Sequence, residues 1–199
     1  PCGFCIELPG TQAELRFGFS FRSVEQAQAN LAAVKDRGFD EIAAQSFAAW
    51  QEVLERITIR TASEQTKTIF YSALYHSLIK PIKAPDESPW WSADTPFFTD
   101  FVTMWDMYKT QLPLVFTLCP DVGKEIVASM LETMATHGEF PIAYLLSDNF
   151  VHCRKQAAAL VHHSLYDAWR RGIEGDWERA ARLMDETFTA ASGAEFVAN

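Results

Sequence analysis

From residue 23 onward the sequence is a succession of segments whose apolar residues recur at the spacing of one helix face, and this pattern restricts the fold most. Ser23 opens the first segment with the capping-box sequence SVEQ, and Gly38 ends it. Asp40 is expected to cap the start of the second helical segment. Further helices are predicted at residues 64–79, 103–118, 122–137, 150–171 and 177–187, with no strand after residue 60. Helices in such an order pair as antiparallel neighbours, which form a bundle, a solenoid or a closed toroid.

Capping signals support several of these helix ends. Gly138 and Gly172 are placed where a left-handed residue would stop two of the helices. Asp121 and Asp176 precede two apolar-periodic segments and are predicted to cap their starts.

Two segments depart from the helical pattern. Residues 13–21 alternate weakly between apolar and polar side chains, which predicts one strand of a half-buried sheet. A lone strand needs partners, and the chain opens PCGFC without an initiator Met, so we expect an internal piece of a longer protein. Residues 81–101 carry four prolines among tryptophans and phenylalanines and are predicted to form a long ordered loop.

Composition limits the classes of partner. The 199 residues are 48% hydrophobic, enough for one sizeable core, and one domain is the default interpretation. A net charge of −9 without a basic cluster argues against nucleic acid. The longest apolar run, residues 112–119, is far shorter than the roughly 20 residues that cross a bilayer, so no membrane partner is expected. No pattern indicates an oligomeric state.

Cysteines and histidines raise the question of a metal. Cys2 and Cys5 form a C-x-x-C, but no second pair follows, and scattered thiols are favoured over a zinc or redox site. Adjacent His162 and His163 would diverge by about 100° on a helix, which disfavours a shared ion. The other possible metal ligands in this region are His137, His152 and Cys153. Neither a metal site nor a metal ligand is predicted.

Carboxylates and aromatic residues interleave in residues 97–109, around Trp105 and Asp106. Sugars have apolar ring faces and a fringe of hydroxyls, so flat aromatic side chains beside charged acceptors suit them. The alternative is that Trp105 lies in the core and Asp106 is a structural acid. Glycoside hydrolysis needs two carboxylates, but Glu139, Asp148 and Asp167 stand in no pattern that assigns a role, so no catalytic residue is predicted.

The same stretch resembles glycoside hydrolase family 92, chiefly calcium-dependent, inverting exo-α-mannosidases. Residues 102–114, VTMWDMYKTQLPL, are similar to the family signature "F-S-L-W-D-T-Y-R-T…P-L". Other segments agree in order: residues 17–31 with "G-I-S-F-V-S-x-E-Q-A-x-x-N-L", 70–76 with "F-Y-T-A-L-Y-H", and 167–173 with "D-A-Y-x-K-G-I". Lys109 departs from the family's Arg, and QAA at 156–158 replaces a legible "M-I-G-x-H" element.

The resemblance implies a mainly α fold whose antiparallel helix pairs form part of an (α/α)6 toroid. Residues 1–22 would end an N-terminal β-sandwich domain, residues 23–60 would be linker helices, and residues 61–199 would form the first half of the catalytic toroid. Trp105 and Asp106 would bind a terminal mannose of a glycan.

The resemblance also implies what lies elsewhere. The family's acid and base motifs, "E-G-x-x-W-Q-Y" and "G-N-D-D-x-G-x-M-S-A-W", do not occur in this sequence, so acid, base and most calcium ligands are expected outside the chain. The full protein would be secreted or periplasmic, and this chain by itself inactive. The alternative is a non-catalytic helical module that binds carbohydrate or protein.

Overall fold

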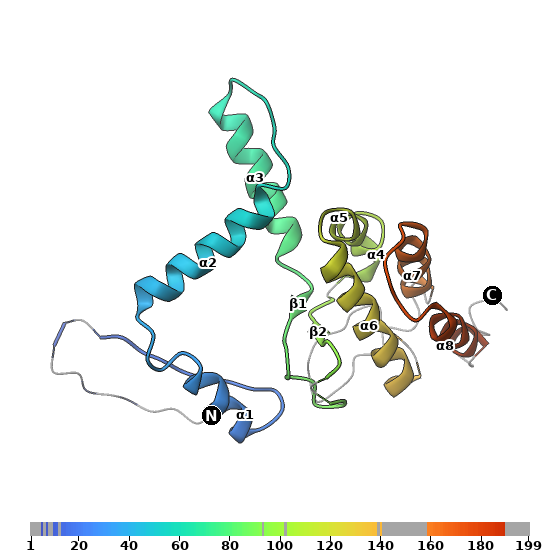
Figure 1. The fold of residues 1–199 in the computed structure, drawn as a ribbon, viewed down its shortest axis with the longest axis horizontal. Helices are drawn as coiled ribbons and strands as arrows, with labels where there is room; N and C mark the ends of the chain where they lie inside the picture. The colour runs from blue at the N-terminus through green and yellow to red at the C-terminus, as the bar shows by residue number, and fades with distance from the viewer. Residues whose placement is uncertain are drawn as a thin grey trace. The chain divides into compact units, whose positions relative to one another are not determined.

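The structure is a computed structural model that describes residues 5, 7, 10–11, 13–92, 94–101, 103–138, 140 and 159–189. The described chain is mainly helical, as predicted, and also contains one small two-stranded sheet (Figure 1). It divides between Val53 and Leu54 into two compact units, and each is considered by itself below. This division separates two compact units and does not test the domain boundaries expected at residues 22 and 60, which therefore stay predictions.

The first unit contains α1 (Val24–Ala32) and most of α2 (Phe39–Leu54). The predicted cap of α1 is confirmed, because Ser23 Oγ accepts a hydrogen bond from the Gln26 amide at 3.1 Å. Asn30 Nδ2 donates to Phe19 O at 3.0 Å and holds the preceding extended segment against α1. A Cβ at Gly18 would overlap the α1 backbone, so this close approach requires glycine.

The strand predicted at residues 13–21 is wrong for the described part of the chain. Residues 13–20 have no regular secondary structure, and Leu15, Phe17 and Phe19 are mostly exposed. A strand exists only when a neighbouring strand completes its hydrogen-bond ladder, and no described strand pairs with this segment.

The second unit is a helical assembly that begins with α3 (Glu64–Leu78), α4 (Met104–Met107) and α5 (Gln111–Leu118). It continues with α6 (Pro120–His137), α7 (Leu160–Arg170) and α8 (Trp177–Thr189). Helix α5 contacts α6 and α7, while α8 contacts α6 and α7, so the helices form two layers (Figure 1). The predicted helix at 103–118 is broken at residues 108–110, and part of the one predicted at 150–171 lies outside the described residues.

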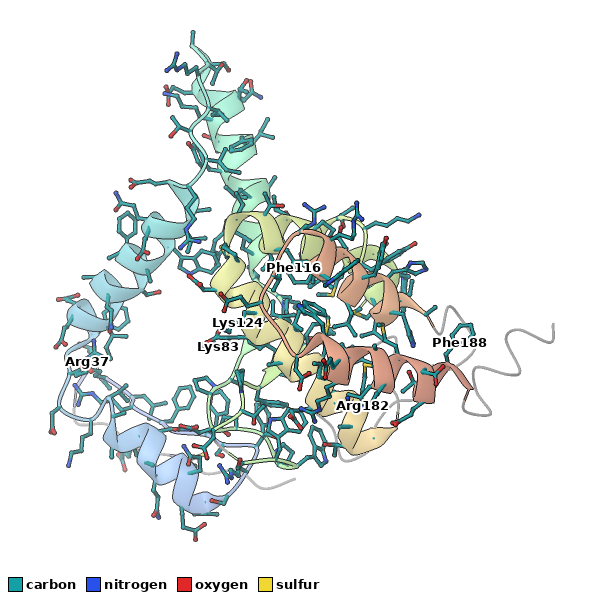
Figure 2. The ribbon with its side chains drawn as sticks, turned by 45° about the vertical axis from the view of Figure 1, so that its right-hand side comes forward. Arg37, Lys83, Phe116, Lys124, Arg182 and Phe188 are labelled. Carbon is teal, nitrogen blue, oxygen red and sulfur yellow. The ribbon has the colours of Figure 1, made fainter. Side chains whose placement is uncertain are left out.

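The core of this unit lies between α5, α6 and α7. Its largest fully buried side chains include Phe97, Phe98, Phe101, Met104, Leu112, Ile126, Met130, Met134 and Leu165. At the corner between α5 and α6, a Cβ on Gly123 would lie 2.9 Å from Phe116 Cδ1, so any larger residue there would force the Phe116 ring to shift. Phe116 is labelled in Figure 2.

The predicted helix ends are confirmed in part. The first helix ends at Ala32 and not at Gly38, and Asp40 lies in the first turn of α2, which begins at Phe39, and does not cap it. Gly138 has φ 72° and Gly172 has φ 77°, the left-handed conformation expected at helix stops. Asp176 Oδ1 accepts from the Arg179 amide at 2.9 Å and caps α8. Asp121 is not the cap of α6, because Pro120 already occupies the first helical position and Asp121 lies in the first turn.

Residues 81–101 contain a short sheet that the sequence pattern did not indicate. Strand β1 (Ile82–Lys83) pairs antiparallel with β2 (Phe98–Thr99), so the expectation of no strand after residue 60 is wrong. Between the strands, Trp91 packs edge-on against Phe97 with ring centroids 5.3 Å apart. Trp90 packs against His137 of α6 at 4.9 Å. The aromatic residues therefore anchor the loop to α6.

Candidate functional site

Helix α4 turns the predicted sugar-binding pair outward. Met104 and Met107 are buried, at 1% and 4% exposure, and hold the short helix against the core. Trp105, between them in sequence, is 43% exposed, and Asp106 is also exposed. Because the methionines take up the buried face, the indole and the carboxylate project from the other faces of the same turn. Trp105 is therefore not a core residue.

The Asp106 side chain is available for a ligand. Its backbone is fixed, since the amide donates to Thr103 O at 3.0 Å and the carbonyl accepts from Thr110 Oγ1 at 2.7 Å. Its carboxylate makes no hydrogen bond or ion pair with any residue that the structure describes. The alternative in which Asp106 braces the helix through its side chain therefore has no contact to support it.

More exposed aromatic residues lie on α7, which contacts α4. The rings of Tyr108 and His163 are 5.9 Å apart and join the two helices. One turn further along α7, Tyr166 and Trp169 are 57% and 50% exposed, with centroids 5.8 Å apart. Residues 163, 166 and 169 are three apart in sequence, a spacing that places side chains close together on a helix. The sequence analysis did not identify this aromatic group. Tyr166 and Trp169 therefore give α7 an exposed aromatic surface of its own, of the kind that suits sugar rings.

The other carboxylates considered from sequence do not join this surface as free groups. Asp167 pairs with Arg171 Nε at 2.7 Å, one turn away on α7, while Arg171 Nη1 donates to Thr117 Oγ1 of α5 at 2.9 Å. Asp167 therefore helps connect α7 to α5. Glu139 and Asp148 lie outside the described residues. Lys109, which replaces the arginine of the family signature, lies over the Tyr108 ring with Nζ 5.4 Å from its centroid.

The two adjacent histidines point to different partners. His162 Nε2 lies 3.1 Å from Met184 O and 3.0 Å from Thr187 Oγ1, whereas His163 stacks near Tyr108. Burial lowers the pKa of His162, the nearby His163 lowers it further, and the hydrogen bond to Met184 O opposes them. Within the described ranges, no three His, Cys, Asp or Glu side chains are grouped to hold a metal ion.

Two further observations bear on the sequence predictions. Cys5 is exposed and Cys119 buried, both as free thiols, while Cys2, His152 and Cys153 lie outside the described residues. No described helix combines the length and apolarity needed to cross a bilayer.

Two helix layers, with α5 beside α7 and α6 beside α8, place this chain in the class of α/α toroid proteins. The sequence matches the glycosyl hydrolase family 92 catalytic domain over residues 26–197, and the chain belongs to this family. The chain is 30% identical over 106 residues to an uncharacterized secreted glycosidase of Arthroderma benhamiae, covering 51% of this chain and 14% of that protein.

Solved structures agree with this assignment. A family 92 inverting mannosidase of Bacteroides thetaiotaomicron superposes with TM-score 0.71 and 27% identity, covering 83% of this chain and 24% of that one. A family 92 α-mannosidase of the same organism, also solved in complex with mannoimidazole, superposes with TM-score 0.73 and 24% identity over 86% of this chain. The chain thus spans about a quarter of the length of these enzymes.

Proposed function

We propose that the protein containing this chain is an exo-acting α-mannosidase that removes terminal mannose from glycans with inversion. The observation that carries the proposal is the exposed Trp105 and Asp106 pair on α4, with a carboxylate that no described residue engages. Membership of family 92 and the 27% identity to a protein named an inverting mannosidase support it.

Asp106 and Trp105 have separate roles in this proposal. A carboxylate accepts hydrogen bonds from two hydroxyls at once, so Asp106 would select a sugar with a suitable pair of hydroxyls. Trp105 would cover the apolar face of the ring and exclude water from one side of the bond to be cleaved. Both residues bind and orient the sugar, and neither transfers a proton in this proposal.

The acid and the base of the reaction are proposed to lie outside this chain. In inversion, one carboxylic acid protonates the leaving oxygen while a carboxylate on the opposite side of the ring activates water. Asp167 is held by Arg171, and Asp106 is assigned to the sugar hydroxyls, so neither fits these roles. The neighbouring surface of α4 and α7 instead positions the substrate for groups supplied elsewhere.

Calcium is proposed as a cofactor of the complete protein, with its ligands outside this chain. Calcium takes six to eight oxygen ligands. The described residues do not fit such a site, since no cluster of acidic side chains is present among them. No step of the mechanism assigned to this chain therefore depends on the ion.

The complete protein is proposed to be secreted or periplasmic. One relative of this chain is described as a secreted glycosidase, and glycan substrates are found outside the cytoplasm. Mannose-containing glycans are the proposed partners; nucleic acids and membranes are not.

The test is hydrolysis by the complete protein. We expect release of mannose from aryl α-mannosides and from α-linked mannose oligosaccharides, with β-mannose as the first product seen by NMR. We expect residues 1–199 by themselves to give no turnover above buffer. A complete protein that binds mannosides without cleaving them would instead identify a non-catalytic carbohydrate-binding module.

A further inference from the structure

A side-chain hydroxyl closes the turn that carries Asp106. Helix α4 stops after Met107, and α5 starts at Gln111. In a continuous helix the backbone amide of Thr110 would donate to Asp106 O. The chain turns at residues 108–110 instead, and no described backbone amide bonds to that carbonyl. The Thr110 side chain takes this place, because its Oγ1 donates to Asp106 O at 2.7 Å.

Thr110 uses its hydroxyl differently from most residues at the start of a helix. It is the N-cap residue of α5, and a threonine there usually accepts a hydrogen bond from an amide of the first turn. The Thr110 side chain makes no such bond. Its proton is directed backward, to the carbonyl of Asp106 four residues earlier. The hydroxyl therefore holds the Asp106 turn and does not cap α5.

Both peptide groups of Asp106 are held by hydrogen bonds. The amide donates to Thr103 O at 3.0 Å, and the carbonyl accepts from Thr110 Oγ1. The direction in which the side chain leaves the backbone depends on the orientation of these two peptide planes. The carboxylate makes no hydrogen bond or ion pair with any residue that the structure describes. The backbone at Asp106 is therefore the part of the site whose geometry the protein controls by hydrogen bonds.

The start of α5 is a fixed reference for the Thr110 bond. Gln111 Nε2 donates to Ser77 O at 2.8 Å and also to Lys80 O, which connects α5 to the end of α3. Leu112, in the next position, is fully buried. Helix α4, by contrast, has only four residues and therefore few internal hydrogen bonds. Thr110 thus connects the Asp106 turn to a helix that is anchored independently.

Resting on the proposed function above, we propose that Thr110 is a positioning residue for the cleavage of the mannoside. Thr110 does not touch the sugar in this proposal. It holds the Asp106 peptide so that the carboxylate meets two hydroxyls of the terminal sugar at once. Such a double contact depends strongly on orientation, since a rotation of the acceptor lengthens one of the two bonds. An acceptor that is oriented in advance lowers the entropy cost of binding.

The test measures hydrolysis of an aryl α-mannoside by the complete protein. Thr110→Val keeps the shape of the side chain and removes the donor. We expect it to lower kcat/KM about fivefold, mainly through KM, which corresponds to the loss of one ordinary hydrogen bond. The melting temperature should change little, because the bond lies at the surface. Thr110→Ser keeps the hydroxyl and should retain most of the wild-type activity.

Thr68→Val is the matched control. Thr68 Oγ1 donates to Glu64 O at 3.0 Å, which is the same kind of exposed bond to the fourth residue before it, on α3. This variant should leave the kinetics unchanged. A Thr110→Val variant with wild-type kinetics, or a Thr110→Ser variant as impaired as Thr110→Val, would overturn the proposal.

A double-mutant cycle separates positioning from a general effect on the fold. Asp106→Ala removes the carboxylate but should leave slow turnover, because the acid and the base are proposed to lie elsewhere. In this background Thr110→Val should change kcat/KM less than about twofold, since the group that it positions is gone. Calorimetric binding of methyl α-mannoside to the same four proteins gives the cycle a second readout. A fivefold loss in both backgrounds would show that Thr110 acts on the fold and would overturn the proposal.

The proposed function fails by a different result. A wild-type complete protein that cleaves no α-mannoside would remove the mannosidase proposal and the role of Thr110 with it. Wild-type turnover together with any of the contrary results above would remove the role of Thr110 alone.

Discussion

The hydroxyl of Ser129 on α6 accepts a hydrogen bond from the backbone amide of Phe98 on β2, at 3.0 Å, with both residues buried. Ser129→Ala would leave that amide without its partner, away from water. An unsatisfied buried donor costs about 1–3 kcal/mol, so we expect a clear fall in the melting temperature. Ser72→Ala on the exposed face of α3 is the control. Equal melting temperatures for both variants would show that Phe98 finds another acceptor.

Asp106 gives the central prediction about activity. In the complete protein, Asp106→Asn should lower kcat/KM by about tenfold or more, because a hydrogen bond to a charged group contributes about 1.5–3 kcal/mol. Asp106→Ala should lower it further. Melting temperatures should stay unchanged, since no described residue depends on this carboxylate. Asp121→Asn, at an exposed position of α6, controls for the loss of one surface charge. Lower stability with unchanged kinetics would remove Asp106 from the site.

His162 gives a prediction about pH. Its Nε2 faces Met184 O and Thr187 Oγ1, whereas Nδ1 is buried with no partner among the described residues. Because burial lowers its pKa, the unfolded chain takes up a proton at a higher pH than the folded chain does. Stability should therefore fall as the pH drops below about 6.5, the ordinary value for histidine.

His162→Gln keeps a donor near the Nε2 position and removes the titration. We expect the melting temperature of this variant to fall less than that of wild type when the pH is lowered from 7 to below about 6.5. His163→Gln, at the exposed neighbouring position, should retain most of the wild-type slope. The same acid dependence in wild type and in His162→Gln would mean that other groups control it.

Gly138 gives a prediction about the end of α6. Its φ of 72° is unfavourable for any residue with a Cβ, even though open space surrounds it. Gly138→Ala should cost about 1 kcal/mol or more of unfolding free energy, through backbone conformation and not through a clash. Gly38→Ala, where φ is not positive and space is also open, is the matched control. Equal effects at both positions would argue against the left-handed stop.

Calcium should leave the melting temperature of residues 1–199 unchanged at millimolar concentration. A ligand stabilises a protein only when it binds the folded form, and the described residues offer no cluster of acidic oxygens. Magnesium at the same concentration is the control for ionic strength. An upward shift of several degrees that EDTA reverses would place the ion within this chain.

Local signals in the sequence account for much of the helical architecture. Ser23 and Asp176 start helices, and Gly138 stops one, because each satisfies the backbone within a few residues of itself. The break after Met107 had no such signal, since residues 108–110 are compatible with a helix. The pairing of Ile82 with Thr99 was equally hidden, because a two-residue ladder joins segments far apart in sequence.

The candidate site shows the same contrast. Trp105 and Asp106 stood out because aromatic and acidic residues alternate there, but their exposure depends on Met104 and Met107 entering the core. The ring contact of Tyr108 with His163 requires α4 and α7 to pack, which no single segment encodes. Tertiary packing therefore determines the surface that the motif occupies.

The missing side chain at Gly123 has a consequence for protein engineering. Phe116 and Ile173 close over this position, so the corner of α5 and α6 and the loop before α8 share one contact point. Chimeras that exchange α5, which carries Phe116, between related enzymes must exchange residues 123 and 173 as well. A recombination point placed between residues 116 and 123 would take the two sides of this packing contact from different parent proteins.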